Sequence, residues 1–159
     1  MKDNHEFLIK DCILINCKPE FLYNYWINLE NLPLFMSHLI DVKRNGNNKS
    51  IWTAKAPLGL SVSWEANIID DKLNEFISWQ SLPNSDVTNY GKVFFKKVII
   101  CEDPTPKYAT LLEIELFYKP PLGTLGEKVS SLLGENPKQQ IAMDLQTLKE
   151  KIEKINIIL

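Results

Sequence analysis

Residues 60–68 read Leu-Ser-Val-Ser-Trp-Glu-Ala-Asn-Ile, so every second side chain is apolar and the ones between are polar. Successive side chains of a β-strand point to opposite faces, and this alternation therefore predicts a strand with one dry face and one wet face. Residues 112–118 repeat the pattern with one exception, because Phe117 falls among the polar positions. We expect a sheet whose outer face is partly covered near Phe117.

Six segments from residue 39 onward have β-type composition, and turn-forming sequences such as residues 45–48 (Asn-Gly-Asn-Asn) and 83–86 (Pro-Asn-Ser-Asp) separate them. Links this short join antiparallel neighbours, because parallel strands need a long crossover connection. A further strand is expected at Glu6–Asn16. The other predicted strands are Leu39–Arg44, Ser50–Ala56, Leu60–Ile69, Glu75–Ser81, Gly91–Cys101 and Tyr108–Tyr118.

Two short helices are expected after the first strand. From Pro19 to about Asn28 apolar residues lie three and four positions apart, and Pro19 suits the first position of a helix. A second helical piece, Leu29–His38, is interrupted by Pro33.

The C-terminal part also has helical spacing. Residues 122–133 form one such stretch, and a long helix is expected from Pro137, with Asn136 as its N-cap. A coiled coil could use the apolar stripe of this helix, but the stripe is shorter than three to four heptads, so we expect it to pack on the sheet. The stripe consists of Ile141, Leu145, Leu148, Ile152 and Ile155.

Size and charge narrow the classes of function. The chain has 159 residues, which fits one domain spanning 1–159, and a net charge of −2. A principal nucleic-acid partner is not expected, because phosphate recognition requires a basic excess. The polar N-terminus and the absence of a long apolar run predict a cytoplasmic protein without an integral membrane segment.

Cysteines and histidines give no metal-binding pattern. Cys12, Cys17 and Cys101 include no C-x-x-C pair, and we expect all three to be reduced packing residues. His5 and His38 are too few and too far apart to argue for a metal site. The sequence therefore predicts neither a metal nor a cofactor.

Seven segments carry a resemblance that spans nearly the whole chain: residues 32–39 (LPLFMSHL), 52–59 (WTAKAPLG), 62–66 (VSWEA), 77–81 (ISWQS), 91–95 (GKVFF), 118–126 (YKPPLGTLG) and 144–146 (DLQ). With these segments in this order, the chain resembles the START-like (SRPBCC, helix-grip) superfamily, specifically its bacterial polyketide cyclase/dehydrase-like branch. One departure is Gln80, where relatives are expected to carry a basic residue.

The resemblance implies an α+β helix-grip (START/Bet v 1-like) fold, in which a curved antiparallel β-sheet wraps around a long C-terminal α-helix and two short helices follow the first strand. It also implies a deep cavity between the concave sheet face and that helix, which the superfamily uses for lipids, sterols, polyketides and plant hormones. The expected function is the binding of a small hydrophobic ligand, such as a lipid or polyketide, for transport or modification.

Aromatic and aliphatic side chains on the dry faces are the candidate cavity residues, because they bury large areas while indole N–H and phenol O–H groups can orient a polar end. The alternative for each tryptophan is that it only fills the core. Tyr118 is the candidate for a hydrogen bond to a ligand carbonyl. The predicted ligand-binding residues are Trp64, Trp79, Phe95, Leu116, Tyr118, Met143 and Leu148.

Two other functions stay open. A polyketide aromatase or cyclase would need a titratable group inside the cavity with a pKa near 7, and the candidates are His38 and Glu65, although Glu65 alternates onto the wet face. No residue is predicted to be catalytic on the present pattern. A module that binds a protein partner, as START-like chaperone cofactors do, would need an exposed apolar patch, for which Phe117 and residues 157–159 are the only hints.

Overall fold

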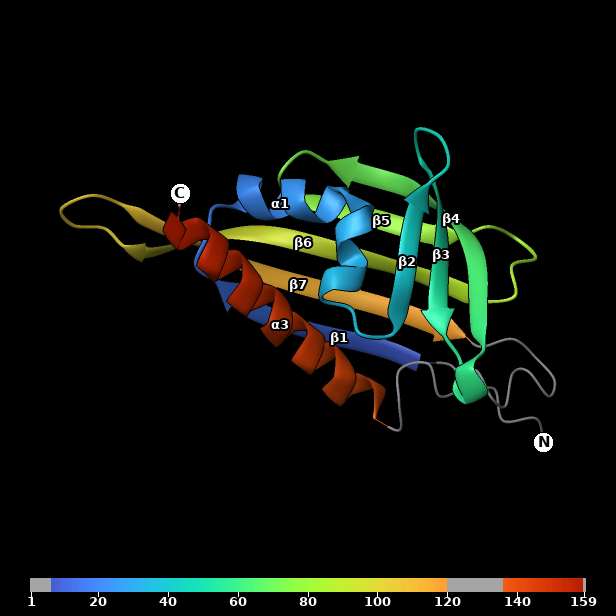
Figure 1. Ribbon diagram of the computed structural model, residues 1–159. Coiled ribbons are helices and arrows are strands. Elements are labelled where there is room, and N and C mark those ends of the chain that lie inside the picture. The colour runs from blue at the N-terminus through green and yellow to red at the C-terminus, as the bar shows by residue number, and fades with distance from the viewer. Residues whose placement is uncertain (1–6, 120–135, 159) are drawn as a thin grey trace.

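Seven strands form one antiparallel sheet in the computed structural model, which describes residues 7–119 and 136–158 (Figure 1). The order across the sheet is β1-β7-β6-β5-β4-β3-β2. The predicted strands are all present, with ends shifted by a few residues at most, and the α+β helix-grip fold is confirmed. The strands are β1 Phe7–Ile15, β2 Leu39–Arg44, β3 Lys49–Lys55, β4 Ser61–Lys72, β5 Phe76–Ser81, β6 Thr88–Cys101 and β7 Lys107–Lys119.

Residues with positive φ close the turns between successive strands. Gly46 has a φ of 112° between β2 and β3, Asn74 has a φ of 64° between β4 and β5, and Asn84 has a φ of 65° between β5 and β6. Glycine and asparagine adopt this conformation at lower cost than other residues. The turn sequences predicted at residues 45–48 and 83–86 therefore lie at two of these connections, whereas the turn at Asn74 was not predicted.

Two short helices follow β1. Helix α1, Pro19–Ile27, begins directly after an extended Lys18 and has proline at its first position, as predicted. The 3-10 helix η1 spans Leu29–Leu34, so the predicted helical piece is four residues too long at its end. It stops because Phe35 leaves the helical region, with a φ of −133°, and the chain then turns into β2.

Two further points concern helices. A short 3-10 helix, η2 (Pro57–Gly59), lies between β3 and β4 and was not predicted. The predicted helical stretch at residues 122–133 lies outside the described residues.

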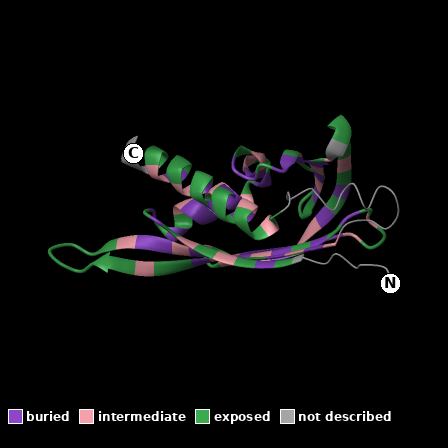
Figure 2. Cartoon of the chain, turned by 90° about the horizontal axis from the view of Figure 1, so that it is seen from below, coloured by how far each residue is buried: buried purple, intermediate pink, exposed green. Residues whose placement is uncertain are grey.

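Helix α3, Pro137–Ile158, starts where the sequence predicts. The backbone N–H of Gln139 donates to Oδ1 of Asn136 over 3.1 Å, which is the expected N-cap contact. Helices α1 and α3 lie on the same side of the curled sheet, and we call this side the inner face (Figure 2). Four residues of the predicted stripe are buried, namely Ile141, Leu145, Leu148 and Ile152.

Aromatic rings fill the space between α1 and the inner face. Trp26 of α1 is fully buried, and its ring centroid lies 5.2 Å from that of Phe35, 6.5 Å from Trp79 and 6.3 Å from Phe95. Trp52 continues the cluster, stacked 6.1 Å from Trp79. This part of the inner face is therefore packed by the protein's own side chains.

Candidate ligand-binding site

Six of the seven predicted ligand-binding residues are buried. Trp64, Trp79, Phe95, Leu116 and Tyr118 come from β4, β5, β6 and β7, and Leu148 comes from α3. The strand residues alternate with outward-facing neighbours, as the sequence predicts.

The placement of Met143 is a correction. Its side chain is 58% exposed, so it does not close the space between α3 and the sheet. The physical reason is helical geometry, because Met143 follows Ile141 by two positions and so lies about 200° around the helix from the buried stripe.

Two of the four tryptophans have satisfied indole N–H groups. Nε1 of Trp79 donates to Oδ1 of Asn89 over 3.0 Å, and Nε1 of Trp52 donates to Oγ of Ser50 over 2.8 Å. These bonds hold both rings in the aromatic cluster. Trp79 therefore has a packing role that sequence reasoning could not separate from a ligand-binding one.

The indole N–H groups of the other two tryptophans are not satisfied in this way. Nε1 of Trp26 and Nε1 of Trp64 are buried and have no hydrogen-bond partner among the described residues. Trp64 lies opposite Trp52 on the neighbouring strand, with ring centroids 6.0 Å apart. A buried donor without a partner is unfavourable by about 1–3 kcal/mol, and these two N–H groups are therefore left unsatisfied by the described residues.

A polar contact joins α3 to the segment between η1 and β2. Asp144 is 3% exposed, and its Oδ1 accepts hydrogen bonds from the backbone N–H of Ser37 over 3.3 Å and from Nε2 of Gln140 over 3.0 Å. Nε2 of Gln140 also lies 2.7 Å from Oγ of Ser37. Burial raises the pKa of the Asp144 carboxyl, although these hydrogen bonds lower it in part.

His38 follows Ser37 directly and is also buried. Its Nδ1 has no hydrogen-bond partner among the described residues, and burial lowers the pKa of the imidazole to about 4. The ring is therefore neutral at pH 7. A base with so low a pKa is a weak proton acceptor, which disfavours His38 as a general base in this environment.

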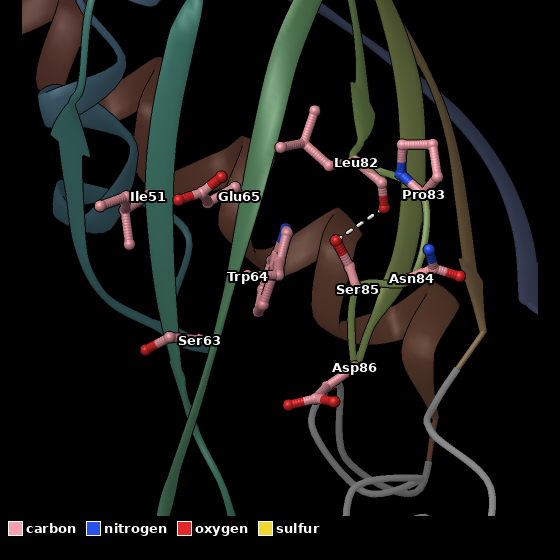
Figure 3. A pocket seen from close by; sticks show the side chains of 9 residues that line it. All are labelled: Ile51, Ser63, Trp64, Glu65, Leu82, Pro83, Asn84, Ser85 and Asp86. Atoms are coloured by element: carbon pink, nitrogen blue, oxygen red, sulfur yellow. Dashed lines mark hydrogen bonds between the residues drawn. The ribbon is translucent and has the colours of Figure 1, made fainter.

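Glu65 lies on the outer face, as its alternation predicts, and borders an open hollow of about 450 Å³ (Figure 3). The hollow separates the outward-facing side of β3 and β4 from the segment after β5, where Oγ of Ser85 donates to the carbonyl of Leu82. Glu65 is thus remote from α3, and the structure does not bring it together with His38. The hollow is lined by Ile51, Ser63, Trp64, Glu65, Leu82, Pro83, Asn84, Ser85 and Asp86.

A second open hollow, of about 540 Å³, lies on the outer face near Phe117. The ring of Phe117 stacks on Tyr90 with centroids 4.5 Å apart, and Nζ of Lys92 lies 4.2 Å from the ring centroid of Phe76. The apolar outer position at Phe117 is therefore explained by an aromatic pair across β6 and β7. The helices of the described residues lie on the inner face, the opposite side of the sheet (Figure 2).

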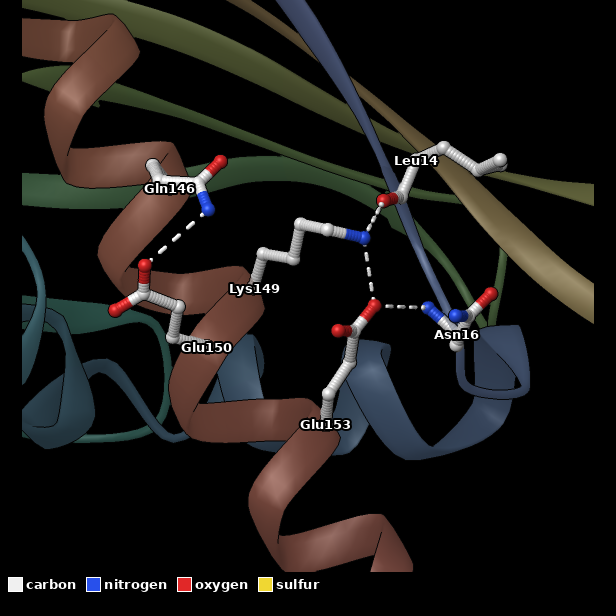
Figure 4. Close-up of polar contacts among 6 residues, drawn as sticks. All are labelled: Leu14, Asn16, Gln146, Lys149, Glu150 and Glu153. Carbon is white, nitrogen blue, oxygen red and sulfur yellow. Dashed lines mark hydrogen bonds and ion pairs between the residues drawn. The ribbon is translucent and has the colours of Figure 1, made fainter.

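A second polar contact fixes α3 against the end of β1 (Figure 4). Nζ of Lys149 donates to the carbonyl of Leu14 over 2.7 Å and to Oε1 of Glu153 over 2.6 Å, while the same Oε1 accepts the backbone N–H of Asn16 over 3.0 Å. Burial acts to raise the pKa of Glu153, but the bonds from Lys149 and Asn16 outweigh it and lower the pKa. Helix α3 is thus attached to the body at two places.

The part of the chain that the structure describes shows neither a metal-binding cluster nor a membrane-spanning helix. Residues 7–119 and 136–158 contain no group of three or more histidine, cysteine or acidic side chains placed to hold a metal ion. None of the helices within these ranges combines the length and the apolar character needed to cross a bilayer.

Comparison with known proteins agrees with this geometry. A curled antiparallel sheet that holds a long C-terminal helix on its inner face is the architecture of the START-like helix-grip fold. Residues 15–146 match the family model described as polyketide cyclase / dehydrase and lipid transport, and the chain belongs to this family. No curated protein matches the sequence.

Solved structures extend the likeness. DR_A0006 from Deinococcus radiodurans is 30% identical with a TM-score of 0.72, and the match covers 92% of this chain and 97% of that one. The ZhuI aromatase/cyclase from Streptomyces sp. R1128 is 10% identical with a TM-score of 0.63, covering 94% and 95%. A START superfamily protein from Mycobacterium smegmatis is 16% identical with a TM-score of 0.62, covering 91% and 98%. The last two show the fold alone.

Sequence reasoning missed Asp144 as a candidate. It lies three positions after Ile141 and four before Leu148, on the stripe that packs on the sheet, and this spacing was the available signal. Aspartate is rarely buried without a partner, so an acid on an apolar helix face indicates either a hydrogen-bond contact or a ligand contact.

Proposed function

We propose that this chain binds a small hydrophobic molecule, such as a lipid or a polyketide, between the inner face of the sheet and α3. The observation that carries the proposal is the combination of an apolar inner face with the buried indole N–H of Trp64, which lacks a partner among the described residues. A ligand oxygen would satisfy such a donor and recover part of the desolvation cost. Membership of a family described by lipid transport supports the same assignment.

Tyr118 is a further candidate contact. Its hydroxyl lies on a buried side chain of β7, and burial raises the pKa of the phenol, so the group stays protonated at physiological pH and can donate a hydrogen bond. Leu116 and Leu148 supply apolar surface from the sheet and from the helix. We propose that these side chains contact the apolar body of the ligand.

Native mass spectrometry of the protein purified from its own cells tests the proposal directly. We expect a bound species that adds the mass of one small lipid-like or polyketide-like molecule and that is lost on organic extraction. Trp64→Phe removes the unpartnered N–H while keeping an aromatic ring, and it should reduce the bound fraction. Trp52→Phe is the matched control, because its N–H already bonds to Ser50.

The proposal is wrong if Trp64→Phe and Trp52→Phe reduce the fraction of protein with bound ligand by the same amount. A co-purifying mass the size of a whole protein would instead favour the partner-binding alternative, with the outer face near Phe117 as its contact surface.

Catalysis on the ligand is the second candidate, favoured by Asp144, a buried carboxyl whose pKa is raised by burial; His38 is buried as well, with a neutral imidazole. A cyclase or aromatase uses such groups to move protons at acidic carbons. Conversion of a poly-β-keto substrate by the wild-type protein, and its loss in Asp144→Asn, would establish this function. If Asp144→Asn and His38→Phe both convert the substrate at the wild-type rate, these groups are not the acid and base.

A further inference from the structure

A row of mainly apolar side chains crosses the outer face of the sheet. Residues paired across β1, β7, β6 and β5 form it, namely Leu8, Phe117, Tyr90 and Gln80. Leu8 is 63% exposed and Tyr90 is 44% exposed. Ile69 of β4, which is 58% exposed, borders the same hollow of about 540 Å³. Large apolar side chains that are exposed next to one another indicate a contact surface.

A row of charged side chains runs beside the apolar row, two residues further along each strand. In the order β1, β7, β6, β5 and β4 it consists of Lys10, Glu115, Lys92, Ser78 and Asp70. Nζ of Lys10 lies 3.5 Å from Oε1 of Glu115, and both side chains are largely exposed. The row carries charges of both signs, so a uniformly acidic or basic partner would meet like charges, and the matching surface is one that also carries both.

A second copy of the chain is a partner with such a surface. A two-fold axis parallel to the strands reverses the order of the strands but keeps the position along them, so each row faces the same row of the other copy. Two sheets that pack face to face in this way lie about 10 Å apart, with their strands within about 30° of each other. The apolar rows then meet each other, and so do the charged rows.

The charges select where the axis lies. An axis over β6 brings Lys92 onto Lys92 of the second copy, and an axis over β7 brings Glu115 onto its own copy. An axis between β6 and β7 brings each Lys92 opposite Glu115 of the other chain. Only the third arrangement pairs opposite charges at this point.

We propose that the outer face binds a second copy of this chain, with the two-fold axis between β6 and β7. Tyr90 of each copy faces Phe117 of the other, and Lys92 faces Glu115. Leu8 of one copy meets Gln80 of the other, at the hollow that both residues line. This surface is separate from the proposed ligand site, because α3 lies on the opposite side of the sheet (Figure 2).

The area of this face fits a weak dimer. Adjacent strands lie about 4.8 Å apart and successive residues about 3.3 Å apart. The five strands from β1 to β4 and the part of β6 from Tyr90 to Lys96 therefore cover roughly 24 Å by 23 Å, or about 550 Å² in each copy. The total of about 1,100 Å² is close to the lower limit for specific interfaces, so we expect a dissociation constant of about 10–100 µM.

Sedimentation velocity over a range of concentrations tests the dimer. The wild type should sediment as a monomer at about 1 µM and mainly as a dimer at about 1 mM. Native mass spectrometry identifies the partner, because a second copy adds the mass of the chain itself, 18.4 kDa.

Two charge reversals then test the position of the axis. Lys92→Glu and Glu115→Lys each place like charges opposite each other twice in the dimer, and each should weaken it at least about tenfold. An equimolar mixture of the two variants should dimerise within about threefold of the wild type. In the mixed pair the carboxylate introduced at position 92 faces the ammonium introduced at position 115, and the unchanged Glu115 faces the unchanged Lys92.

Matched controls separate this contact from a general effect of charge. Lys151→Glu and Glu150→Lys make the same reversals on the exposed side of α3, so each should dimerise as the wild type does, and mixing them should have no effect. Tyr90→Ser removes an exposed ring without changing any charge and should weaken the dimer about tenfold. It provides a second measurement if a charge variant fails to fold.

Several results would overturn the inference. A wild type that stays monomeric up to about 1 mM excludes the dimer. A dimer that Lys92→Glu, Glu115→Lys and Tyr90→Ser leave intact forms through another surface. If both charge variants weaken the dimer but their mixture does not restore it, Lys92 does not face Glu115. An equal gain on mixing the two α3 variants would assign the rescue to net charge.

Discussion

Replacing Gly91 by alanine should destabilise the protein through a single contact. A Cβ atom at this position would lie 2.3 Å from Cζ2 of Trp79 and 2.8 Å from both Cε2 and Cη2. The ring cannot retreat freely, because it is 2% exposed, donates to Asn89 and stacks on Trp52. Insertion of atoms into a packed core typically is unfavourable by about 1–3 kcal/mol.

An opposing effect reduces this figure. Alanine loses less conformational entropy than glycine on folding, which favours the variant by about 0.5–1 kcal/mol, and Gly91 does not have a positive φ that alanine would resist. We expect a net loss of about 1–2 kcal/mol in the free energy of unfolding. For a chain of this size that lowers Tm by roughly 2–8 °C.

A double-mutant cycle with Trp79→Phe isolates the contact. Phenylalanine lacks the outer ring atoms Cζ2 and Cη2, which include the atom nearest to the new Cβ, so Gly91→Ala in that background should be close to neutral or stabilising by up to about 1 kcal/mol. Urea denaturation followed by circular dichroism measures all four free energies. An equal loss in both backgrounds would refute the reasoning, because the effect would then come from the backbone of β6 rather than from the indole ring.

Three more predictions follow from buried or paired groups. Between pH 6.5 and about 4 the unfolded state protonates His38 while the folded state does not, so stability should fall by up to about 3 kcal/mol as the pH drops through this window. The raised pKa of Asp144 has the opposite effect, because it adds stability as the pH falls. The contribution of His38 is therefore measured as the difference between the wild type and His38→Gln in how the free energy of unfolding depends on pH. Cys17, whose pKa burial raises to about 11, should react with 5,5′-dithiobis(2-nitrobenzoate) at pH 8 only after unfolding, whereas the two exposed cysteines react at once. Lys149→Met and Glu153→Gln should each lower stability by about 1 kcal/mol in urea titrations, and the double variant should lose less than the sum.

Local sequence patterns were sufficient to predict the strands of the sheet and their antiparallel order. Alternation in residues 60–68 identified the buried side of β4, and the turn residues Gly46 and Asn84 marked two of its antiparallel connections. These features depend only on neighbouring residues, because the period of a strand and the φ preferences of glycine and asparagine are local properties.

The site was less predictable because it depends on distant partners. Ser37 and Asp144 meet across 107 positions, so the place of Asp144 on the apolar stripe could indicate its burial but no local pattern could name its partner. The tryptophans show the same limit, since Trp52 and Trp64 face each other on adjacent strands and only Trp52 has an acceptor among the described residues. Met143 was misplaced for a different reason, because apolar character was given more weight than its angle on the helix.

The two attachments of α3 bear on how a ligand is held. Asp144 and Gln140 fix the helix to the segment after η1, and Lys149 and Glu153 fix it to the end of β1. A helix rises about 1.5 Å per residue, so the contacts at residues 144 and 149 are separated by roughly 7–8 Å along its axis. A rigid body held at two such points resists rotation as well as withdrawal. The position of α3 relative to the sheet is then set before any ligand binds, and a preorganised site loses little entropy on binding.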